Sequence, residues 1–226
     1  IHDYFGENAD LSELVYDKGF AGVEDMVIID KNTRTVFGKF AALFSGKLDW
    51  VEPPSEEAVK NCSVVGCDPF FGDEIARPCV KHGKPYAVID TMHDDFMNKN
   101  CAVNAISHQH IKEKYPDLTF EQSHKLYTDN TDGLVIFTCG EGEMLYGRRG
   151  EKPKSFGAYA VDVQSTLGAG DSFKAGTIYG LYKGLDDDEL VRFAAATAAF
   201  SCAHFPIWRY PAKVEDVLEI IKADKH

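Results

Sequence analysis

No stretch of this chain is apolar over the ~18 residues that a membrane-spanning helix needs, and its N-terminus does not resemble a signal peptide. It has no run of Lys and Arg, and its net charge is −12, which argues against a nucleic-acid-binding surface. It also has no internal repeat, low-complexity tract or linker. We therefore expect a soluble, cytoplasmic protein whose partners include neither nucleic acid nor a membrane.

The cysteines lack the Cys-x-x-Cys spacing of many zinc sites, so a thiolate metal site is not expected. The chain has six of them, scattered through apolar segments: Cys62, Cys67, Cys79, Cys101, Cys139 and Cys202. Buried free thiols suit a reducing cytoplasm, although the even number leaves disulfides open as an alternative. His108 and His110 lie in a polar stretch, and we expect them to be solvated rather than to act as ligands.

The 226 residues, 44% of them hydrophobic, are enough for one large domain or for a domain with a small appendage. Strand-like and helix-like segments alternate along the chain. We predict strands over 26–30, 35–40, 62–67, 85–90, 133–138, 143–146 and 158–161, and helices over 73–81, 119–127, 171–183, 187–203 and 214–222. The first two strands, joined by residues 31–33, predict a hairpin, and the alternation predicts an α/β fold with a mostly parallel sheet.

The most informative segment reads Ser-Thr-Leu-Gly-Ala-Gly-Asp-Ser-Phe over residues 165–173. Its small residues Gly168, Ala169 and Gly170 allow a tight turn and leave room for a ligand against the main chain. A predicted helix follows the turn. Because the start of a helix offers free N–H groups and a positive dipole end, this turn is a candidate seat for an anion such as phosphate.

Asp171 comes directly after the predicted anion seat, where its carboxylate can take a proton from an attacking hydroxyl. An anion seat and a base side by side are the parts of a phosphoryl-transfer site. The alternative is an ordinary loop and helix start, in which the side chain of Asp171 or Ser172 caps the first free amides.

Three blocks occur in order along the chain. Residues 134–146 form a strand followed by a Thr-x-Gly turn, residues 166–171 read Thr-Leu-Gly-Ala-Gly-Asp, and the alanine-rich helix over 187–203 is followed by Pro211. Together they resemble the ribokinase family of sugar kinases, also called the phosphofructokinase-B family, from about Met26 to the C-terminus. The resemblance implies a three-layer α-β-α fold with helices on both sides of a mostly parallel central sheet, and a small β hairpin or lid near the N-terminus.

The resemblance also implies a kinase that uses ATP and a divalent metal such as Mg²⁺ to phosphorylate a hydroxyl of a sugar-type small molecule. Asp171 is then the general base, and the amides of residues 168–170 form the anion hole. Residues 203–210 edge the adenine pocket. The residues assigned to the cofactor are Thr138, Gly140, Asn104 and Thr166, and no side chain is assigned to the metal.

Two positions depart from the family pattern. Ser165 stands where the family usually has an aspartate that helps to hold a monovalent cation in some members, which puts that ion in doubt. The Asn-x-x-Glu motif becomes Asn104-Ala-Ile-Ser107, in which serine replaces the carboxylate. Shifting the match by three residues puts Ser107 and His110 at these two positions, still without a carboxylate. The resemblance then implies weaker metal binding, or binding through waters.

The front of the chain departs further. Residues 1–25 contain nothing like the strand and Gly-Gly-Asn-type motif with which the family grips its sugar, and the chain has no Gly-Gly pair. Since the first residue is Ile1 and not methionine, we expect one ribokinase-like kinase domain, residues 1–226, that is incomplete at its N-terminus. Family members often pair through their lids, so a homodimer is expected by analogy.

Residues 34–38 and the pair Ile207-Trp208 resemble the family branch that phosphorylates fructosamines such as fructoselysine. The alternative is structural: a hairpin strand with Val36 and Phe37 in its core, and a tryptophan packed at a helix end. The leading hypothesis is an ATP-dependent carbohydrate kinase. Two other functions stay open, a non-catalytic relative that senses a nucleotide or sugar, and a nucleoside kinase of the same fold.

Overall fold

The computed structural model describes residues 6, 9–14, 18–19, 25–29, 34–38 and 53–224. The chain divides into two compact units, Ile1–Ala58 and Val59–His226. In the first unit, β1 (Asp25–Ile29) pairs with β2 (Arg34–Gly38) in antiparallel register. The predicted hairpin is thereby confirmed. Its predicted turn, 31–33, and the predicted strand ends at 30 and 39–40 lie outside the described residues.

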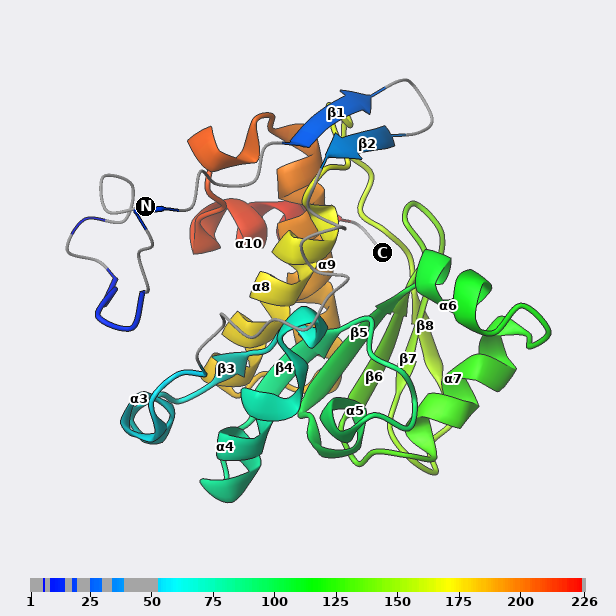
Figure 1. Ribbon diagram of the computed structural model, residues 1–226. Helices are drawn as coiled ribbons and strands as arrows, with labels where there is room; N and C mark the ends of the chain where they lie inside the picture. Colours follow the sequence, from blue (N-terminus) through cyan, green and yellow to red (C-terminus); the bar gives the residue numbers. More distant parts are fainter. Residues whose placement is uncertain are drawn as a thin grey trace. The chain divides into compact units, whose positions relative to one another are not determined.

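The second unit is built on a sheet of six strands in the order β3-β4-β5-β6-β7-β8 (Figure 1). The pairs from β3 to β6 are parallel, and β7 and β8 continue the sheet antiparallel. The strands are β3 (Val65–Gly66), β4 (Tyr86–Ile89), β5 (Val103–Ser107), β6 (Leu134–Thr138), β7 (Met144–Gly147) and β8 (Lys154–Phe156). This is the mostly parallel sheet that the strand–helix alternation predicts.

Helices follow and connect the strands, and two of them begin with a capping box, at Thr119 and at Asp186. The α-helices are α3 (Glu56–Asn61), α4 (Ala76–Lys81), α5 (Phe96–Asn100), α6 (His108–Lys114), α7 (Phe120–Thr128), α8 (Ala169–Lys183), α9 (Asp187–Ala203) and α10 (Val214–Ala223). The described residues also include the 3₁₀ segments η2 (Pro69–Glu74) and η3 (Ile207–Arg209).

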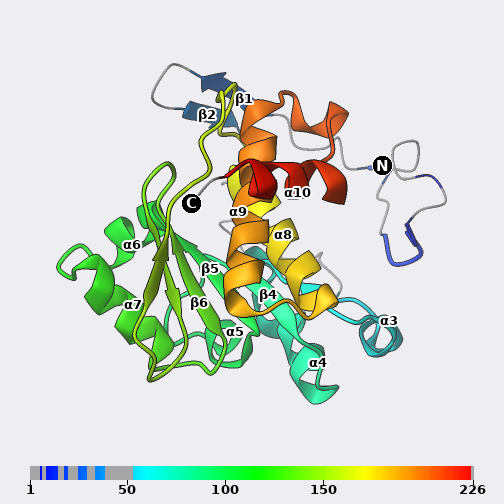
Figure 2. The same ribbon diagram turned by 180° about the vertical axis from the view of Figure 1, so that it is seen from behind.

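Each face of the sheet has its own core, because successive side chains of a strand point to opposite faces. On β6, Leu134 and Ile136 belong to the core shared with α8 and α9. Val135 and Phe137 belong to the core shared with Tyr127 of α7. Figures 1 and 2 show α8 and α9 on one side of the sheet and α6 and α7 on the other. The expected α-β-α layering is confirmed.

Helices α8 and α9 approach each other closely. A Cβ atom on Gly176 would lie 2.6 Å from the Cα atom of Ala194, and one on Gly180 would lie 2.7 Å from Cγ of Leu190. Real Cβ atoms do not come so near to other atoms, so only glycine fits at these two positions of α8. The small residues of the 187–203 helix therefore serve close helix packing, as the structural interpretation of that segment predicts.

Several elements differ from the sequence predictions. Residues 158–161 form no strand: Tyr159 is buried beside the ring of Phe156, but the last strand of the sheet is 154–156. The predicted helix over 73–81 begins later, at Ala76, because residues 73 and 74 belong to the 3₁₀ segment η2, which is kinked at Gly72 (φ of +67°). Strand β5 and helices α5 and α6 were not predicted at all.

Candidate functional site

The site lies at one edge of the sheet. Since β3, β4, β5 and β6 run parallel, their carboxyl ends meet at the same edge, where ligands bind in open α/β sheets. The residues that follow or end these strands are polar: Asp68 after β3, Asp90 after β4, Ser107 at the end of β5 and Thr138 at the end of β6. Ser107 and Thr138 are direct partners in the register of β5 and β6.

Helix α8 points its N-terminus toward this edge. Lys174 Nζ lies 3.5 Å from the Asp68 carboxylate, just beyond the end of β3. One turn further along α8, Ile178 covers Gly66, the last residue of β3. Because α8 therefore runs from beyond the carboxyl ends back over the sheet, its first turn, 169–171, stands outside the ends of the parallel strands.

The turn before α8 is open to solvent. Gly168 is the N-cap, with φ of +81°, and a Cβ atom there would lie 2.6 Å from Cδ1 of Ile207. Gly170 is exposed, and a Cβ atom there would meet nothing within 4 Å. Thus Gly168 is needed for the backbone and for packing, whereas Gly170 leaves free space in front of the helix N-terminus.

Two of the three predicted amides are available. The N–H of Ala169 donates to the Thr166 carbonyl at 3.3 Å, so it is already engaged. Within the described part of the chain, the N–H groups of Gly168 and Gly170 have no acceptor. The anion hole that the sequence predicts over 168–170 therefore rests on these two glycine amides, together with the positive end of the α8 dipole.

The Asp171 carboxylate is exposed and has no hydrogen bond or ion pair to any residue that the structure describes. The N-cap of α8 is Gly168, which has no side chain, and no described N–H of the first turn donates to the side chain of Asp171 or Ser172. The alternative of an ordinary side-chain cap is therefore wrong. A carboxylate left unpaired beside free amides fits the predicted base.

Ser165 lies below the turn and is 4% exposed. Its Oγ accepts the N–H of Leu167 at 3.2 Å, and its own N–H donates to the carbonyl of Cys202 at 3.2 Å. Its hydroxyl thus shapes the turn. Thr166 next to it is exposed.

Thr138 and Gly140 lie on a second turn at the same edge. Thr138 ends β6 and is half-buried, with its Oγ1 3.5 Å from the Ile106 carbonyl. Gly140 is exposed, has φ of +59°, and would place a Cβ atom in open space. The turn is closed by the Gly142 N–H, which donates to the Cys139 carbonyl at 2.8 Å.

Asn104 is not exposed at this edge. It lies in the middle of β5 with 0% exposure, and its Nδ2 donates to Oγ1 of Thr91 at 2.7 Å and to Oδ1 of Asn98 at 2.9 Å. Its Oδ1 is buried without a partner among the described residues. The structure therefore argues against Asn104 as a nucleotide ligand, because its amide supports the interior. The residue that ends the strand is Ser107.

A cluster around Ser107 was not predicted as a unit. Asp90 is the non-glycine residue with positive φ, +47°, in the described part of the chain, and such strain tends to be retained at functional sites. Its carboxylate accepts the Ser107 N–H at 2.7 Å and the Ser107 Oγ–H at 3.2 Å. The His110 N–H in turn donates to the Ser107 Oγ at 3.1 Å. Asp90 could have been found from its place at the end of the predicted strand 85–90.

The two histidines of this region are less solvated than expected. His108 is half-buried, with its ring 6.4 Å from that of Phe120. The Nε2 atom of His110 is buried without a partner among the described residues. Burial lowers the pKa of His110, opposed by the charge of Asp90. The expectation of solvated rings is wrong because α6 packs both side chains near the sheet.

The segment after α9 carries exposed aromatic side chains next to the turn. Phe205, Trp208 and Tyr210 are 45%, 59% and 49% exposed, and Arg209 lies over the Trp208 ring at 4.9 Å. Ile207 of the same segment is the residue that covers Gly168. Flat apolar surface therefore lies beside the candidate anion seat.

The donor set suits a magnesium ion carried by a nucleotide. Among the described residues, no three His, Cys, Asp or Glu side chains are grouped so that they could hold a metal ion. Magnesium in kinase sites usually keeps several waters and is bound by substrate phosphates with one or two carboxylates. The open space at Gly170 has room for the phosphate oxygens that would carry the ion.

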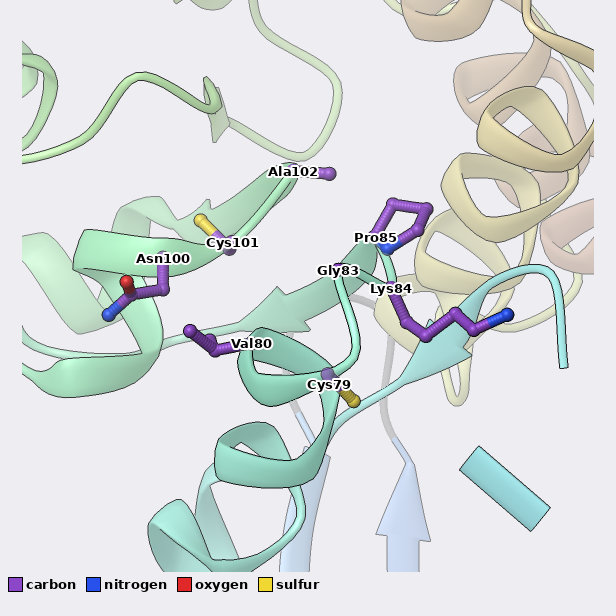
Figure 3. Close-up of a pocket in the computed structure, with 8 residues that line it drawn as sticks. All are labelled: Cys79, Val80, Gly83, Lys84, Pro85, Asn100, Cys101 and Ala102. Atoms are coloured by element: carbon purple, nitrogen blue, oxygen red, sulfur yellow. The ribbon is translucent and has the colours of Figure 1, made fainter. Parts of the chain in front are cut away.

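Two cavities lie at the opposite edge of the sheet. The one in Figure 3, of about 360 Å³, is lined by the end of α4 and by the segments that lead into β4 and β5. A second, of about 380 Å³, shares Asn100, Cys101 and Ala102 with it and reaches Arg148. Neither is lined by any predicted site residue.

The expectations on thiols and membrane spans can also be compared with the structure. All six cysteines are free thiols. Among the described helices, none combines the length and the apolar composition that a bilayer span requires.

The fold is that of ribokinases. The Arabidopsis thaliana ribokinase solved with ribose and ATP matches with a TM-score of 0.70 and 20% identity, over 88% of this chain and 69% of that one. The Thermotoga maritima ribokinase matches with a TM-score of 0.68 and 18% identity, over 88% and 69%. These likenesses define the class: an α/β protein of ribokinase-like fold.

Residues 98–205 match the family described as pfkB family carbohydrate kinase. The 5-dehydro-2-deoxygluconokinase of Bacillus velezensis is 33% identical over 104 residues, which are 46% of this chain and 31% of that protein. The 1-phosphofructokinase of Escherichia coli K12 is 37% identical over 93 residues, 39% of this chain and 28% of that protein. These matches span about a third or less of the relatives' lengths. The match over residues 98–205, just under half of the chain, confirms the resemblance to the pfkB family that is seen in the sequence.

Proposed function

We propose that the protein is an ATP-dependent kinase that transfers the γ-phosphate to a hydroxyl of a carbohydrate. One observation carries the proposal: the turn before α8 reaches solvent at the exposed Gly170, at the carboxyl edge of the sheet, with free amides at the helix start and the unpaired carboxylate of Asp171 beside them. A buried turn would have excluded a ligand.

The reaction follows from this geometry. The acceptor hydroxyl gives its proton to the Asp171 carboxylate while its oxygen attacks the γ-phosphorus of ATP. The bond from that phosphorus to the β,γ-bridging oxygen breaks, ADP leaves, and the phosphate ester remains. The N–H groups of Gly168 and Gly170 stabilise the charge on the transferring group, since fixed donors act best where the charge develops.

We assign the rest of the nucleotide to the same edge. Thr138, Gly140 and Thr166 would contact phosphates or ribose, and Ser107 would take the role that was predicted for Asn104. The exposed aromatic segment 204–210 suits the base, because aromatic rings stack on it. ATP bound to the Arabidopsis ribokinase, which shares the fold, supports the cofactor. Magnesium would arrive with the phosphates and supply charge neutralisation.

The acceptor is a small molecule of the sugar class. The relatives are named for a deoxygluconate derivative and for fructose 1-phosphate chemistry, so sugar acids and sugar phosphates stand first among candidates. The fructosamine branch rests only on residues 34–38, Ile207 and Trp208. A nucleoside acceptor is the second candidate, because nucleoside kinases also share the fold, as in Methanocaldococcus jannaschii (TM-score 0.69).

The test is ADP formation from ATP and Mg²⁺ with a panel of sugars, sugar acids, sugar phosphates, fructosamines and nucleosides, with products identified by mass. We expect one class of acceptor to gain the mass of a phosphate group. Nucleotide binding measured by calorimetry without transfer to any acceptor would select the non-catalytic sensing alternative. No binding of ATP at all would overturn the proposal.

The proposal also includes a cellular compartment and an oligomeric state. The six free thiols support a reducing compartment such as the cytoplasm. The β1–β2 hairpin exposes Met26, Ile28 and Phe37 at 59%, 53% and 52%, an apolar surface that supports the expected homodimer. Sedimentation of the protein with Met26→Lys tests the dimer, which the charge should dissociate.

A further inference from the structure

The end of α9 holds the turn before α8 at three places. The Cys202 carbonyl accepts the N–H groups of Gln164 and Ser165, at 2.8 and 3.2 Å. Ile207, just after α9, covers Gly168. The third contact joins two side chains: Ser201 Oγ of α9 lies 2.6 Å from Ser172 Oγ of α8.

The contact between the two serines is specific. Ser201 is 7% exposed, so water does not compete freely for its hydroxyl. Its Oγ lies 2.6 Å from Ser172 Oγ and 3.2 Å from the Thr197 carbonyl oxygen, and each serine hydroxyl carries one proton. The two serines therefore share a short hydrogen bond between α9 and α8, whichever hydroxyl donates it.

Ser172 is well placed to pass this constraint to the site. It follows Asp171 directly, and its own N–H closes the first helical hydrogen bond, to the Gly168 carbonyl at 2.9 Å. A restraint on the position of Ser172 therefore also restrains the Gly168 carbonyl, to which its N–H is bonded. The orientation of the Gly168 and Gly170 amides and of the Asp171 side chain depends on the same turn.

Helix α9 is a rigid support for the contact. Gly176 and Gly180 of α8 leave no room between the two helices, since any Cβ atom there would overlap Ala194 or Leu190. The serine pair lies one turn before Gly176 on α8, at the end of this tightly packed seam. A hydrogen bond at that point constrains the first turn of α8, which has no side-chain cap.

We propose that Ser201 is a positioning residue for phosphoryl transfer. It acts through Ser172 to hold the first turn of α8, and with it the glycine amides and the base, in the geometry that the transition state needs. The role in transfer rests on the proposed function above. Small misplacements of such groups cost much rate, because the amides must meet charge where it develops.

The first test compares Ser201→Ala with Thr197→Val, which removes another hydroxyl of α9, one turn earlier, that bonds the Phe193 carbonyl at 2.8 Å. Amide hydrogen exchange of Ser172 and Phe173 should be at least about fivefold faster in Ser201→Ala and unchanged in Thr197→Val, as loss of one buried hydrogen bond predicts. Equal exchange in both variants overturns the proposal.

The second test uses the rates of phosphoryl transfer. In Ser201→Ala, kcat should fall about five- to tenfold while KM for ATP changes less than about twofold, because the loss is confined to the transition state. Ser201→Thr, which keeps the hydroxyl, should recover most of kcat. A rise in KM alone, or no recovery with threonine, contradicts positioning.

A double-mutant cycle combines Ser201→Ala with Ser172→Ala. Because Ser172 is half-buried, Ser172→Ala tests the contact even if Ser201→Ala folds poorly. The double variant should be no slower than the worse single variant, whereas additive losses would show that the two serines act separately. A wild-type protein that transfers phosphate to no acceptor overturns the proposed function. The exchange rate of Ser172 still decides, in that case, whether Ser201 holds the turn.

Discussion

The two edges of the central sheet differ in shape and in chemistry. The amino edge has two cavities, of about 360 and 380 Å³, and the second of them is lined by charged side chains such as Asp132 and Arg148 as well as by small and apolar residues. The carboxyl edge has exposed turns at Gly140 and Gly170 and an unpaired carboxylate at Asp171. Strand direction and free polar groups, rather than cavity volume, therefore identify the site.

The backbone conformation also differs between the two edges. At the carboxyl edge, Asp90 tolerates a left-handed conformation, and its carboxylate orders Ser107. At the amino edge, Gly133 is required only because a Cβ atom would lie 2.3 Å from the Cys101 carbonyl oxygen. Strain at the first edge serves polar contacts, and close packing at the second serves the fold.

The largest expected difference between the edges is the effect on kcat of replacing an aspartate by asparagine. Asp171→Asn at the carboxyl edge should lower kcat by about 10²- to 10⁴-fold, because the amide cannot accept the hydroxyl proton. Asp132→Asn at the amino edge loses only an exposed ion pair to Arg149 and should keep full activity. Coupled ADP release measures both. Full activity of Asp171→Asn would remove its assignment as base.

A pair of glycines sharpens the comparison within the carboxyl edge. Gly170→Ala adds a methyl group in empty space, so the free energy of unfolding should stay unchanged or rise by up to about 1 kcal/mol. The same methyl group would occupy the space proposed for the phosphates, so ATP binding should weaken at least about tenfold. Gly168→Ala should instead destabilise the fold by about 1–2 kcal/mol, since its φ is +81° and Ile207 blocks the space. Thermal unfolding and calorimetry separate the two effects. Tight ATP binding by Gly170→Ala would place the phosphates elsewhere.

The amino edge offers a direct way to break the comparison. Val80→Trp fills the cavity of Figure 3 from an exposed position on α4 and should change kcat/KM by less than about twofold. Steady-state kinetics with the acceptor found in the panel measures this. A large loss would show that this edge binds a ligand that the reaction needs.

The smallest expected effect is on the pH dependence of stability. Burial lowers the pKa of His110 in the folded protein, so the unfolded chain binds more protons below its ordinary pKa of about 6.5. The stability held above that pH should therefore decline as pH falls below it. His110→Gln should flatten the profile of unfolding midpoint against pH relative to that of the wild-type protein. Identical profiles would show that His110 is not buried in solution.

Much of this edge could be predicted from local sequence. The turn at 168–170, the helix that follows it and strand β6 are each specified by neighbouring residues, as small residues before a helix and a continuous apolar run. Helix α9 was predicted with the observed ends, on a first turn rich in Asp and Glu, and the structure shows that Asp186 and Glu189 form a capping box at its start.

Tertiary contacts decide what the sequence could not show. Asn104 falls inside β5, three residues before the strand ends, because the flanking apolar residues place it between β4 and β6. The predicted strand 158–161 has apolar residues but no partner strand, so Tyr159 packs without pairing. The bond between Ser172 and Ser201 joins residues 29 positions apart, which no local pattern reveals.

The contact of Gly176 with α9 has a consequence for how the protein can change. At this point the two helices touch backbone to backbone, so neither can slide or tilt alone. A displacement of α9 would carry the turn before α8 with it, eight residues away from Gly176. Tolerance to substitution should therefore be lowest in the middle of this helix pair, where a single added methyl group would push the helices apart and shift that turn.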